Sequence, residues 1–187
     1  MATLKNELSP LGRKIFLDRY ALKDGKKETV KVGDLVVAVS NIETGQREIG
    51  NVASMKGDDL TVLLEDGTEV NTTRENVDKP IETDPSQMLG RVAKGIAAQE
   101  KGEKRQKWEE EFRWILEDWK FVPGGRILTG AGTVQNLTYF NCYVIPSPKD
   151  SRGGIMESLG QMTEIMSRGG GVGINLSSLR PRHAYVK

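Results

Sequence analysis

Cysteine and histidine are almost missing from this sequence, in which Cys142 and His183 each occur once. A single cysteine excludes an intrachain disulfide and is typical of a reducing compartment, so we expect a cytoplasmic protein. The lone histidine lies in a polar, loop-like segment and is assigned no role. No metal site is predicted.

Excess charge and long apolar runs are missing as well. The 27 basic and 26 acidic side chains leave a formal net charge of +1, without the electrostatic footprint of a nucleic-acid-binding protein. The apolar runs are much shorter than a membrane span, and the N-terminus lacks the apolar region of a signal peptide. We therefore expect neither a nucleic-acid partner nor a membrane.

Glycine, by contrast, is abundant, with 21 residues that crowd the second half of the chain. In that half, a strand-like run at 137–145 surrounds Cys142, and a polar turn follows it. Three glycines at 169–171 and a second apolar run at 172–176 come later. Between the polar turn and these glycines lie four apolar residues at the spacing of a helix face: Ile155, Leu159, Met162 and Met166. The order strand, helix, strand predicts a βαβ unit of a parallel sheet.

The glycine clusters do not match the common phosphate-binding patterns. No Gly-Lys-Ser/Thr follows the glycines at 130–132, which excludes a phosphate-binding P-loop. The glycines at 169–173 follow a helix and precede a strand, which is the reverse of a dinucleotide-binding motif. Several adjacent glycines favour a close approach of the backbone to a ligand.

Four segments are predicted along the chain: a helical arm at 1–29, a small β-barrel at 30–79, a helical domain at 80–122 and an α/β segment at 123–187. Two N-cap signals, Ser9-Pro10 and Asp84-Pro85, begin helices. The arm is expected to pack through a broad apolar face: Leu11, Ile15, Phe16 and Leu22. The last helix of the helical domain has an apolar stripe that predicts core packing: Trp108, Phe112, Ile115, Leu116 and Trp119.

The segment at 30–79 is rich in short strands. Strands are expected near 32–39, 47–52, 60–64 and 68–72, with an Asp66-Gly67 hairpin turn before the last. This pattern favours a small SH3-like barrel. Such barrels often bind RNA or peptides, but acidic residues outnumber basic ones here and aromatic residues for stacking are missing. A structural or docking module is favoured, and a non-catalytic adaptor built on this barrel is the alternative function.

Four motifs in the second half resemble a known enzyme family. They are NCYVIP at 141–146, DSRGGI at 150–155, RGGGVGIN at 168–175 and SSLR at 177–180. Together they resemble the catalytic subunit of ribonucleotide reductase, in particular its adenosylcobalamin-dependent class. The resemblance implies an α/β fold in which a helical N-terminal domain precedes the first strands of a ten-stranded catalytic α/β barrel. A large subunit of the class that takes its radical from a separate diiron protein is the second alternative.

The resemblance implies an oxidoreductase of deoxyribonucleotide biosynthesis, which supplies DNA replication. In that family a cysteine thiyl radical removes the 3′-hydrogen of a ribonucleotide, and a cysteine pair then supplies electrons and becomes a disulfide. Cys142 matches the first member of this pair and is the expected catalytic residue. Without the motifs, an ordinary buried cysteine would be the default interpretation.

Further site residues follow from the same resemblance. It implies substrate contacts at Asn141, Gly170 and Gly171. A second set would bind a dNTP or ATP as allosteric effector: Asp150, Ser151 and Arg180. A carboxylate and a hydroxyl suit the deoxyribose and base of a nucleotide, and a guanidinium suits its triphosphate.

The chain is expected to need a partner. The second reducing cysteine, the thiyl cysteine and most of the adenosylcobalamin-binding surface belong to later strands of the family barrel. We therefore expect activity only with a complementary C-terminal portion, from a split gene or a truncation. The helix at 155–167 resembles the family's dimer helices, which implies a possible homodimer. Di- and triphosphate substrates, and the role of the small barrel, stay open.

Overall fold

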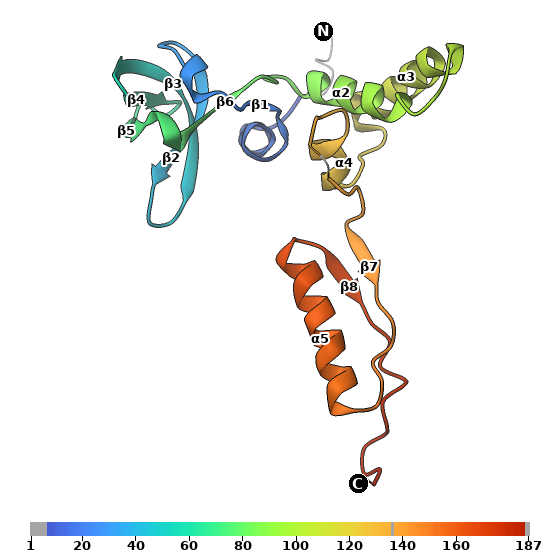
Figure 1. Cartoon of the computed structure of the whole chain (residues 1–187). Coiled ribbons are helices and arrows are strands. Elements are labelled where there is room, and N and C mark those ends of the chain that lie inside the picture. The colour runs from blue at the N-terminus through green and yellow to red at the C-terminus, as the bar shows by residue number, and fades with distance from the viewer. Residues whose placement is uncertain (1–6, 136, 186–187) are drawn as a thin grey trace. The chain divides into compact units, whose positions relative to one another are not determined.

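The computed structural model describes residues 7–135 and 137–185. The chain divides into two compact units, Met1–Asn136 and Leu137–Lys187. They are called the N-terminal unit and the C-terminal unit below, and each is described by itself. Figure 1 labels their helices and strands.

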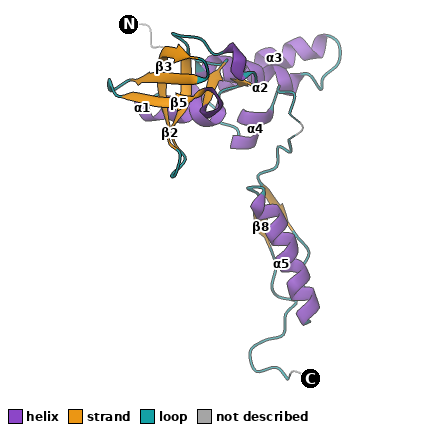
Figure 2. Ribbon diagram, turned by 60° about the vertical axis from the view of Figure 1, so that its left-hand side comes forward, coloured by secondary structure: helices purple, strands orange, loops and turns teal. Residues whose placement is uncertain are grey.

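The N-terminal unit contains an antiparallel sheet in the order β1-β6-β2-β3-β4-β5. The strands are β1 (Lys23–Asp24), β2 (Leu35–Asn41), β3 (Gln46–Lys56), β4 (Asp59–Leu64), β5 (Glu69–Thr73) and β6 (Val77–Pro80). Short 3₁₀ turns, η2 (Lys27–Thr29) and η3 (Arg74–Asn76), precede β2 and β6. Figure 2 shows the strands of this sheet in orange.

The strands expected in this segment are confirmed, with ends that differ by a few residues. The hairpin turn between β4 and β5 has Gly67 at φ +84°, a conformation that favours glycine. Asp66 accepts a hydrogen bond from the Thr68 amide at 2.9 Å in the same turn. Alternate side chains fill a buried cluster inside the sheet: Val30, Val36, Ala38, Val52, Leu60, Val62 and Val77. The SH3-like assignment and the domain boundaries stay predictions.

The N-terminal arm forms α1 (Pro10–Ile15) and a π-helix, η1 (Phe16–Tyr20). The Ser9 hydroxyl accepts a hydrogen bond from the Gly12 amide at 3.1 Å, which confirms the N-cap. The expected apolar face was wrong in part, because Leu11 and Ile15 are exposed while Phe16 and its neighbour Leu17 are buried. The wider π turn places Phe16 and Leu17 toward the core, a shift that a regular 3.6-residue period does not give.

The helical part contains α2 (Pro85–Ala97), α3 (Glu103–Leu116), the 3₁₀ turn η4 (Glu117–Trp119) and α4 (Gly125–Gly130). A capping box formed by Asp84 and Gln87 begins α2, as its N-cap signal predicts. The expected core stripe on α3 was only partly right: Leu116 is buried, whereas Trp108 and Ile115 are exposed. Phe112 and Trp119 are partly buried and pack against the core cluster, and a kink follows α3, where Asp118 has φ +57°.

The glycines near residue 130 serve helix packing. A Cβ on Gly95 of α2 would lie 2.3 Å from the Gly132 amide nitrogen, and one on Gly132 would lie 2.5 Å from the Arg91 carbonyl oxygen. Only glycines allow this approach of α2 to the segment after α4. The region around these glycines therefore contains a short helix, α4, and a close backbone contact.

An ion pair between Glu82 and Arg91 joins the parts of the N-terminal unit. Arg91 Nε and Nη2 lie 2.6 Å and 3.0 Å from the two carboxylate oxygens, and both side chains are less than 10% exposed. Glu82 also accepts the Leu22 amide at 2.8 Å. Arg91 donates to the carbonyls of Leu128 and Ala131, at 3.1 Å and 2.7 Å. The pair is fully hydrogen-bonded, as a buried pair must be.

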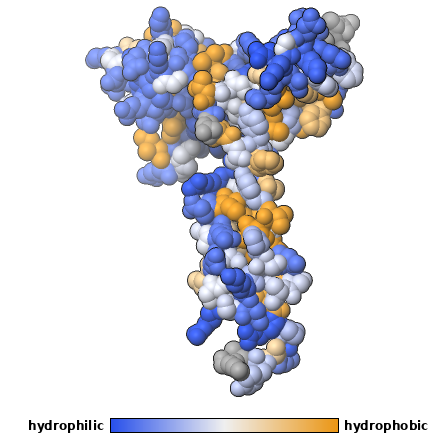
Figure 3. Space-filling view, turned by 45° about the vertical axis from the view of Figure 1, so that its right-hand side comes forward, coloured by the Kyte–Doolittle hydropathy of each residue, from blue (hydrophilic) through white to orange (hydrophobic). Residues whose placement is uncertain are grey.

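The C-terminal unit is the expected βαβ arrangement. The strand β7 (Cys142–Val144) pairs in parallel with β8 (Gly171–Gly173), and α5 (Arg152–Ser167) connects them. Figure 1 shows α5 beside the two strands. Both strands are shorter than predicted. The predicted apolar face of α5 is largely exposed, and Figure 3 shows hydrophobic surface on this unit: Ile155, Leu159 and Met166.

None of the helices that the structure describes is long and apolar enough to cross a membrane.

Candidate functional site

Cys142 begins β7 and is aligned with Gly171 on β8. The Gly171 amide donates a hydrogen bond to the Asn141 carbonyl at 2.8 Å, which fixes this register. The Cys142 thiol is free and the residue is exposed. Asn141 is also exposed. The structure therefore brings Asn141, Cys142 and Gly171 together and leaves the thiol accessible.

Gly171 leaves room for the Cys142 sulfur. A Cβ at position 171 would lie 3.0 Å from Cys142 Sγ, which is closer than an ordinary carbon–sulfur contact. Gly173 lies two residues further along the same strand. A Cβ there would lie 3.6 Å from Val144 Cγ2, at normal van der Waals distance. The strand thus has room for a methyl group at 173, whereas one at 171 requires the Cys142 sulfur to shift by a few tenths of an ångström.

The two preceding glycines have neighbours of their own. Gly169 has φ +75° at the end of α5, where a left-handed residue commonly ends a helix. Gly170 is buried, and a Cβ on it would lie 2.7 Å from Ile165 Cγ2 and 3.2 Å from Tyr143 Cε2. Backbone conformation or close packing within the fold therefore explains glycine at each of the three positions. Contact of Gly170 and Gly171 with a substrate stays a prediction.

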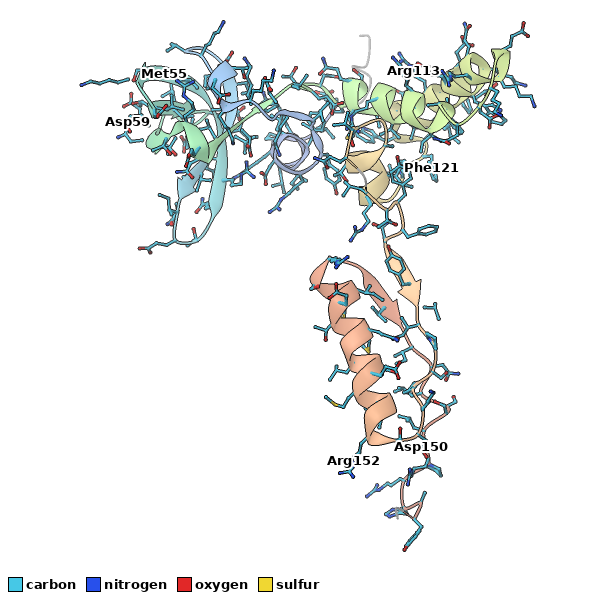
Figure 4. The ribbon with its side chains drawn as sticks, in the orientation of Figure 1. Met55, Asp59, Arg113, Phe121, Asp150 and Arg152 are labelled. Atoms are coloured by element: carbon cyan, nitrogen blue, oxygen red, sulfur yellow. The ribbon has the colours of Figure 1, made fainter. Side chains whose placement is uncertain are left out.

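The residues expected to bind an effector meet at the opposite end of α5. Arg180 Nε donates to both carboxylate oxygens of Asp150, at 3.0 Å and 2.8 Å, and Nη2 donates to the Asp150 carbonyl at 3.2 Å. Ser151 is the N-cap of α5, and its hydroxyl accepts the Gly154 amide at 3.1 Å. Figure 4 labels Asp150 and Arg152 where α5 begins.

Two contacts in this group had no signal in the sequence. The Ser178 hydroxyl donates to the Pro148 carbonyl at 2.6 Å, and Arg180 Nη1 donates to the Tyr185 carbonyl at 3.2 Å. The first contact joins the segment after β8 to the turn before α5, and the second lies within the segment after β8. Every residue has a main-chain carbonyl, so the sequence cannot indicate which carbonyl accepts a hydrogen bond. The SSLR motif drew attention to this region without predicting the two contacts.

Cys142 and the Asp150–Arg180 pair form two separate groups. Cys142 pairs with Gly171, which follows the end of α5, whereas Asp150 precedes its start. The 16 residues of α5 give a helix about 24 Å long. The unit therefore carries a thiol beside one end of its helix and an ion pair beside the other.

Two family models match consecutive parts of this chain. Residues 72–136 match the ribonucleotide reductase all-alpha domain, and residues 140–187 match the ribonucleotide reductase barrel domain. Both models describe domains of ribonucleotide reductase, and the two matched segments together cover more than half of the chain. The chain belongs to the ribonucleotide reductase family of oxidoreductases, with the all-alpha domain and the start of the barrel domain.

Two curated relatives support the same family. Each is a vitamin B12-dependent ribonucleoside-diphosphate reductase from a strain of Mycobacterium tuberculosis, 35% identical over 99 residues. The alignment covers 51% of this chain and 14% of each relative. The chain therefore spans a small share of the length of these relatives.

Proposed function

We propose that this chain is the N-terminal portion of an adenosylcobalamin-dependent reductase that converts ribonucleotides to 2′-deoxyribonucleotides. The vitamin B12 dependence named for the two relatives supports the cofactor class. The observation that carries the proposal is the exposed Cys142 thiol on the first strand of the segment that matches the barrel domain. Cytoplasmic location is part of the proposal, since the chemistry needs reduced thiols.

The reaction replaces the ribose 2′-hydroxyl by hydrogen. A thiyl radical on a cysteine outside this chain takes the 3′-hydrogen, and the 2′-hydroxyl leaves as water. Cys142 and a second cysteine of the complementary portion supply two hydrogens and become a disulfide. A dithiol reductant then restores both thiols for the next turnover.

The local structure suits this role for Cys142. The sulfur is accessible, and its strand is fixed by the register with β8. Gly171 leaves the space beside the sulfur open. A thiol that must meet a ribose 2′ position needs such fixed placement, because small errors in position lower the rate strongly.

The residues that the structure describes do not form a cobalamin site on their own. Cys142 lies on an exposed, two-stranded parallel sheet, and such a surface cannot enclose a corrin ring. No residue of this chain is assigned to the cofactor. We expect the complementary C-terminal portion to bind it, and to complete the barrel with its remaining strands.

The proposal includes an effector and a dimer. Asp150, Ser151 and Arg180 form the candidate specificity site for a dNTP or ATP. The exposed apolar residues of α5 are available to pack against further strands or a second copy of the subunit. Large apolar surfaces of this kind are normally covered by a partner.

A single-turnover experiment tests the role of Cys142. The complete reductase is reduced, freed of dithiol, and given substrate before rapid alkylation. We expect Cys142 to lose its alkylation in step with product, because it enters a disulfide, and mass spectrometry should identify the linked peptide. Full alkylation of Cys142 after one turnover would remove it from the reducing pair.

A further inference from the structure

Cys142 and Tyr143 point to opposite faces of β7, because side chains alternate along a strand. The glycines of the neighbouring segment mark the two faces. A Cβ at Gly171 would lie 3.0 Å from Cys142 Sγ. A Cβ at Gly170, which is buried, would lie 3.2 Å from Tyr143 Cε2. The missing side chain at position 170 therefore makes room for the tyrosine ring, on the face that turns away from the thiol.

The Tyr143 side chain turns back to the residues that precede the cysteine. Its hydroxyl bonds to the Thr138 hydroxyl at 3.2 Å and to the Phe140 carbonyl at 3.4 Å. The Thr138 hydroxyl in turn accepts the Phe140 amide at 3.3 Å. The rings of Phe140 and Tyr143 form a tilted aromatic pair with centroids 6.4 Å apart. A single side chain thus folds residues 138–140 back onto β7.

These contacts hold the segment that leads into Asn141 and Cys142. Residues 138–142 are all exposed, so burial does not hold them in place. On the side of β8, the Gly171 amide bonds to the Asn141 carbonyl at 2.8 Å. On the side of the preceding segment, Tyr143 bonds to residues 138 and 140. The placement of the thiol therefore depends on hydrogen bonds made on both sides of it.

We infer that Tyr143 is a positioning residue for Cys142: its hydroxyl and ring hold residues 138–140 against β7 and so fix the place of the thiol. This inference rests on the proposed function. A thiol that supplies hydrogen to a ribose needs exact placement, because misplacement of a reacting group lowers the rate. The Tyr143 hydroxyl is already bonded within the chain, so this role requires no contact with the substrate.

The rate of Cys142 oxidation in a single turnover of the complete reductase tests this role. The enzyme is reduced, freed of dithiol, mixed with the ribonucleotide that the wild type reduces, and alkylated at successive times. Tyr143→Phe and Thr138→Val should each slow the loss of Cys142 alkylation by about two- to tenfold, the effect of one neutral hydrogen bond. Thr138→Ser keeps the hydroxyl and should restore the wild-type rate. KM and the thermal melt should stay close to wild type, because the lost hydrogen bonds are exposed.

Tyr139→Phe is the matched control. It removes the same phenol hydroxyl from a residue of the same segment that is 41% exposed. Among the described residues, the Tyr139 hydroxyl has no hydrogen-bond partner. Cys142 should be oxidised at the wild-type rate in this variant. Equal slowing by Tyr139→Phe would show a general effect of removing a hydroxyl near the thiol and would overturn the role of Tyr143.

The double variant Tyr143→Phe/Thr138→Val gives a second readout. It should be slower than Tyr143→Phe by less than about twofold, because the two residues act through a shared hydrogen bond. Independent, multiplying effects would overturn the inference, and so would a raised KM or a lowered melt with an unchanged oxidation rate. Normal oxidation in both wild type and Tyr143→Phe would overturn the positioning role alone. A wild-type enzyme that keeps Cys142 fully alkylated after one turnover would instead remove the proposed role of Cys142 itself.

Discussion

Gly171 controls the space beside the reactive thiol. A methyl group at this position would lie 3.0 Å from Cys142 Sγ, so the sulfur would have to move. The required shift is a few tenths of an ångström, and misplacement of a reacting group lowers the rate. The glycine is therefore interpreted as a positioning residue for Cys142, alongside its predicted contact with substrate.

In the complete reductase, Gly171→Ala should lower kcat by about two- to tenfold while KM changes by less than about twofold. Gly173→Ala is the control on the same strand, because a Cβ there finds an ordinary contact at 3.6 Å. It should keep wild-type kinetics. A raised KM with normal kcat for Gly171→Ala would show that Gly171 contributes to substrate binding alone and does not position Cys142.

Arg91 joins several parts of the N-terminal unit through buried hydrogen bonds. Replacing it with alanine leaves the Glu82 carboxylate buried without its partner, and removes the donor to the carbonyls of Tyr20, Leu128 and Ala131. Arg91→Ala should lower the free energy of unfolding by about 3–5 kcal/mol. Denaturant unfolding measures this loss.

Arg113→Ala serves as the comparison for Arg91. The Arg113 side chain is 54% exposed and its ion pair with Glu109 is long, at 3.7 Å. Its replacement should cost no more than about 0.5 kcal/mol. Similar losses of unfolding free energy for the two variants would show that the buried Glu82–Arg91 ion pair does not hold the N-terminal unit together.

At the scale of elements, periodicity and capping residues carried most of the correct predictions. The helix expected from Ile155 to Met166 is present as α5, because Ser151 caps its start and Gly169 ends it. The four main strands of the small sheet were equally visible, since runs of β-branched and other apolar residues and a Gly67 turn define them. Local signals of this kind act through neighbours in the sequence.

Other features depend on distant neighbours and were missed. The two-residue strand β1 exists only through its pairing with β6. The π-helix that buries Phe16 and Leu17 has no periodic signal. At the candidate site, motifs indicated Cys142, Asp150 and Arg180, but not that Asp150 and Arg180 bond each other. Pairing across 30 residues follows from the fold of the βαβ unit.

At the scale of the whole molecule, the small sheet is part of a shared core in the N-terminal unit. Val37 of β2 and Ile49 of β3 lie in one buried cluster with Met88 and Leu89 of α2. The opposite face of β2 fills the sheet's own cluster. A sheet buried on both sides of one strand is a built-in part of its unit, which argues against an adaptor domain on a flexible tether.

The C-terminal unit has far less core of its own. Among its described residues, Ile145 is the one buried hydrophobic side chain. Amide exchange of the isolated 187-residue chain should therefore be fast in β7 and α5, and slow in β2, β3 and β4. Strong protection of β7 in the isolated monomer would contradict the need for further strands.

The most direct test of the central claim is multiple turnover by a Cys142→Ser reductase with excess dithiol. Cys142 is exposed, so the substitution should change the free energy of unfolding by no more than about 0.5 kcal/mol. Serine cannot form the disulfide that stores the oxidation of each cycle. We expect an unchanged thermal melt and no sustained deoxyribonucleotide formation per active site. Sustained turnover at the wild-type rate would show that Cys142 is not in the reducing pair.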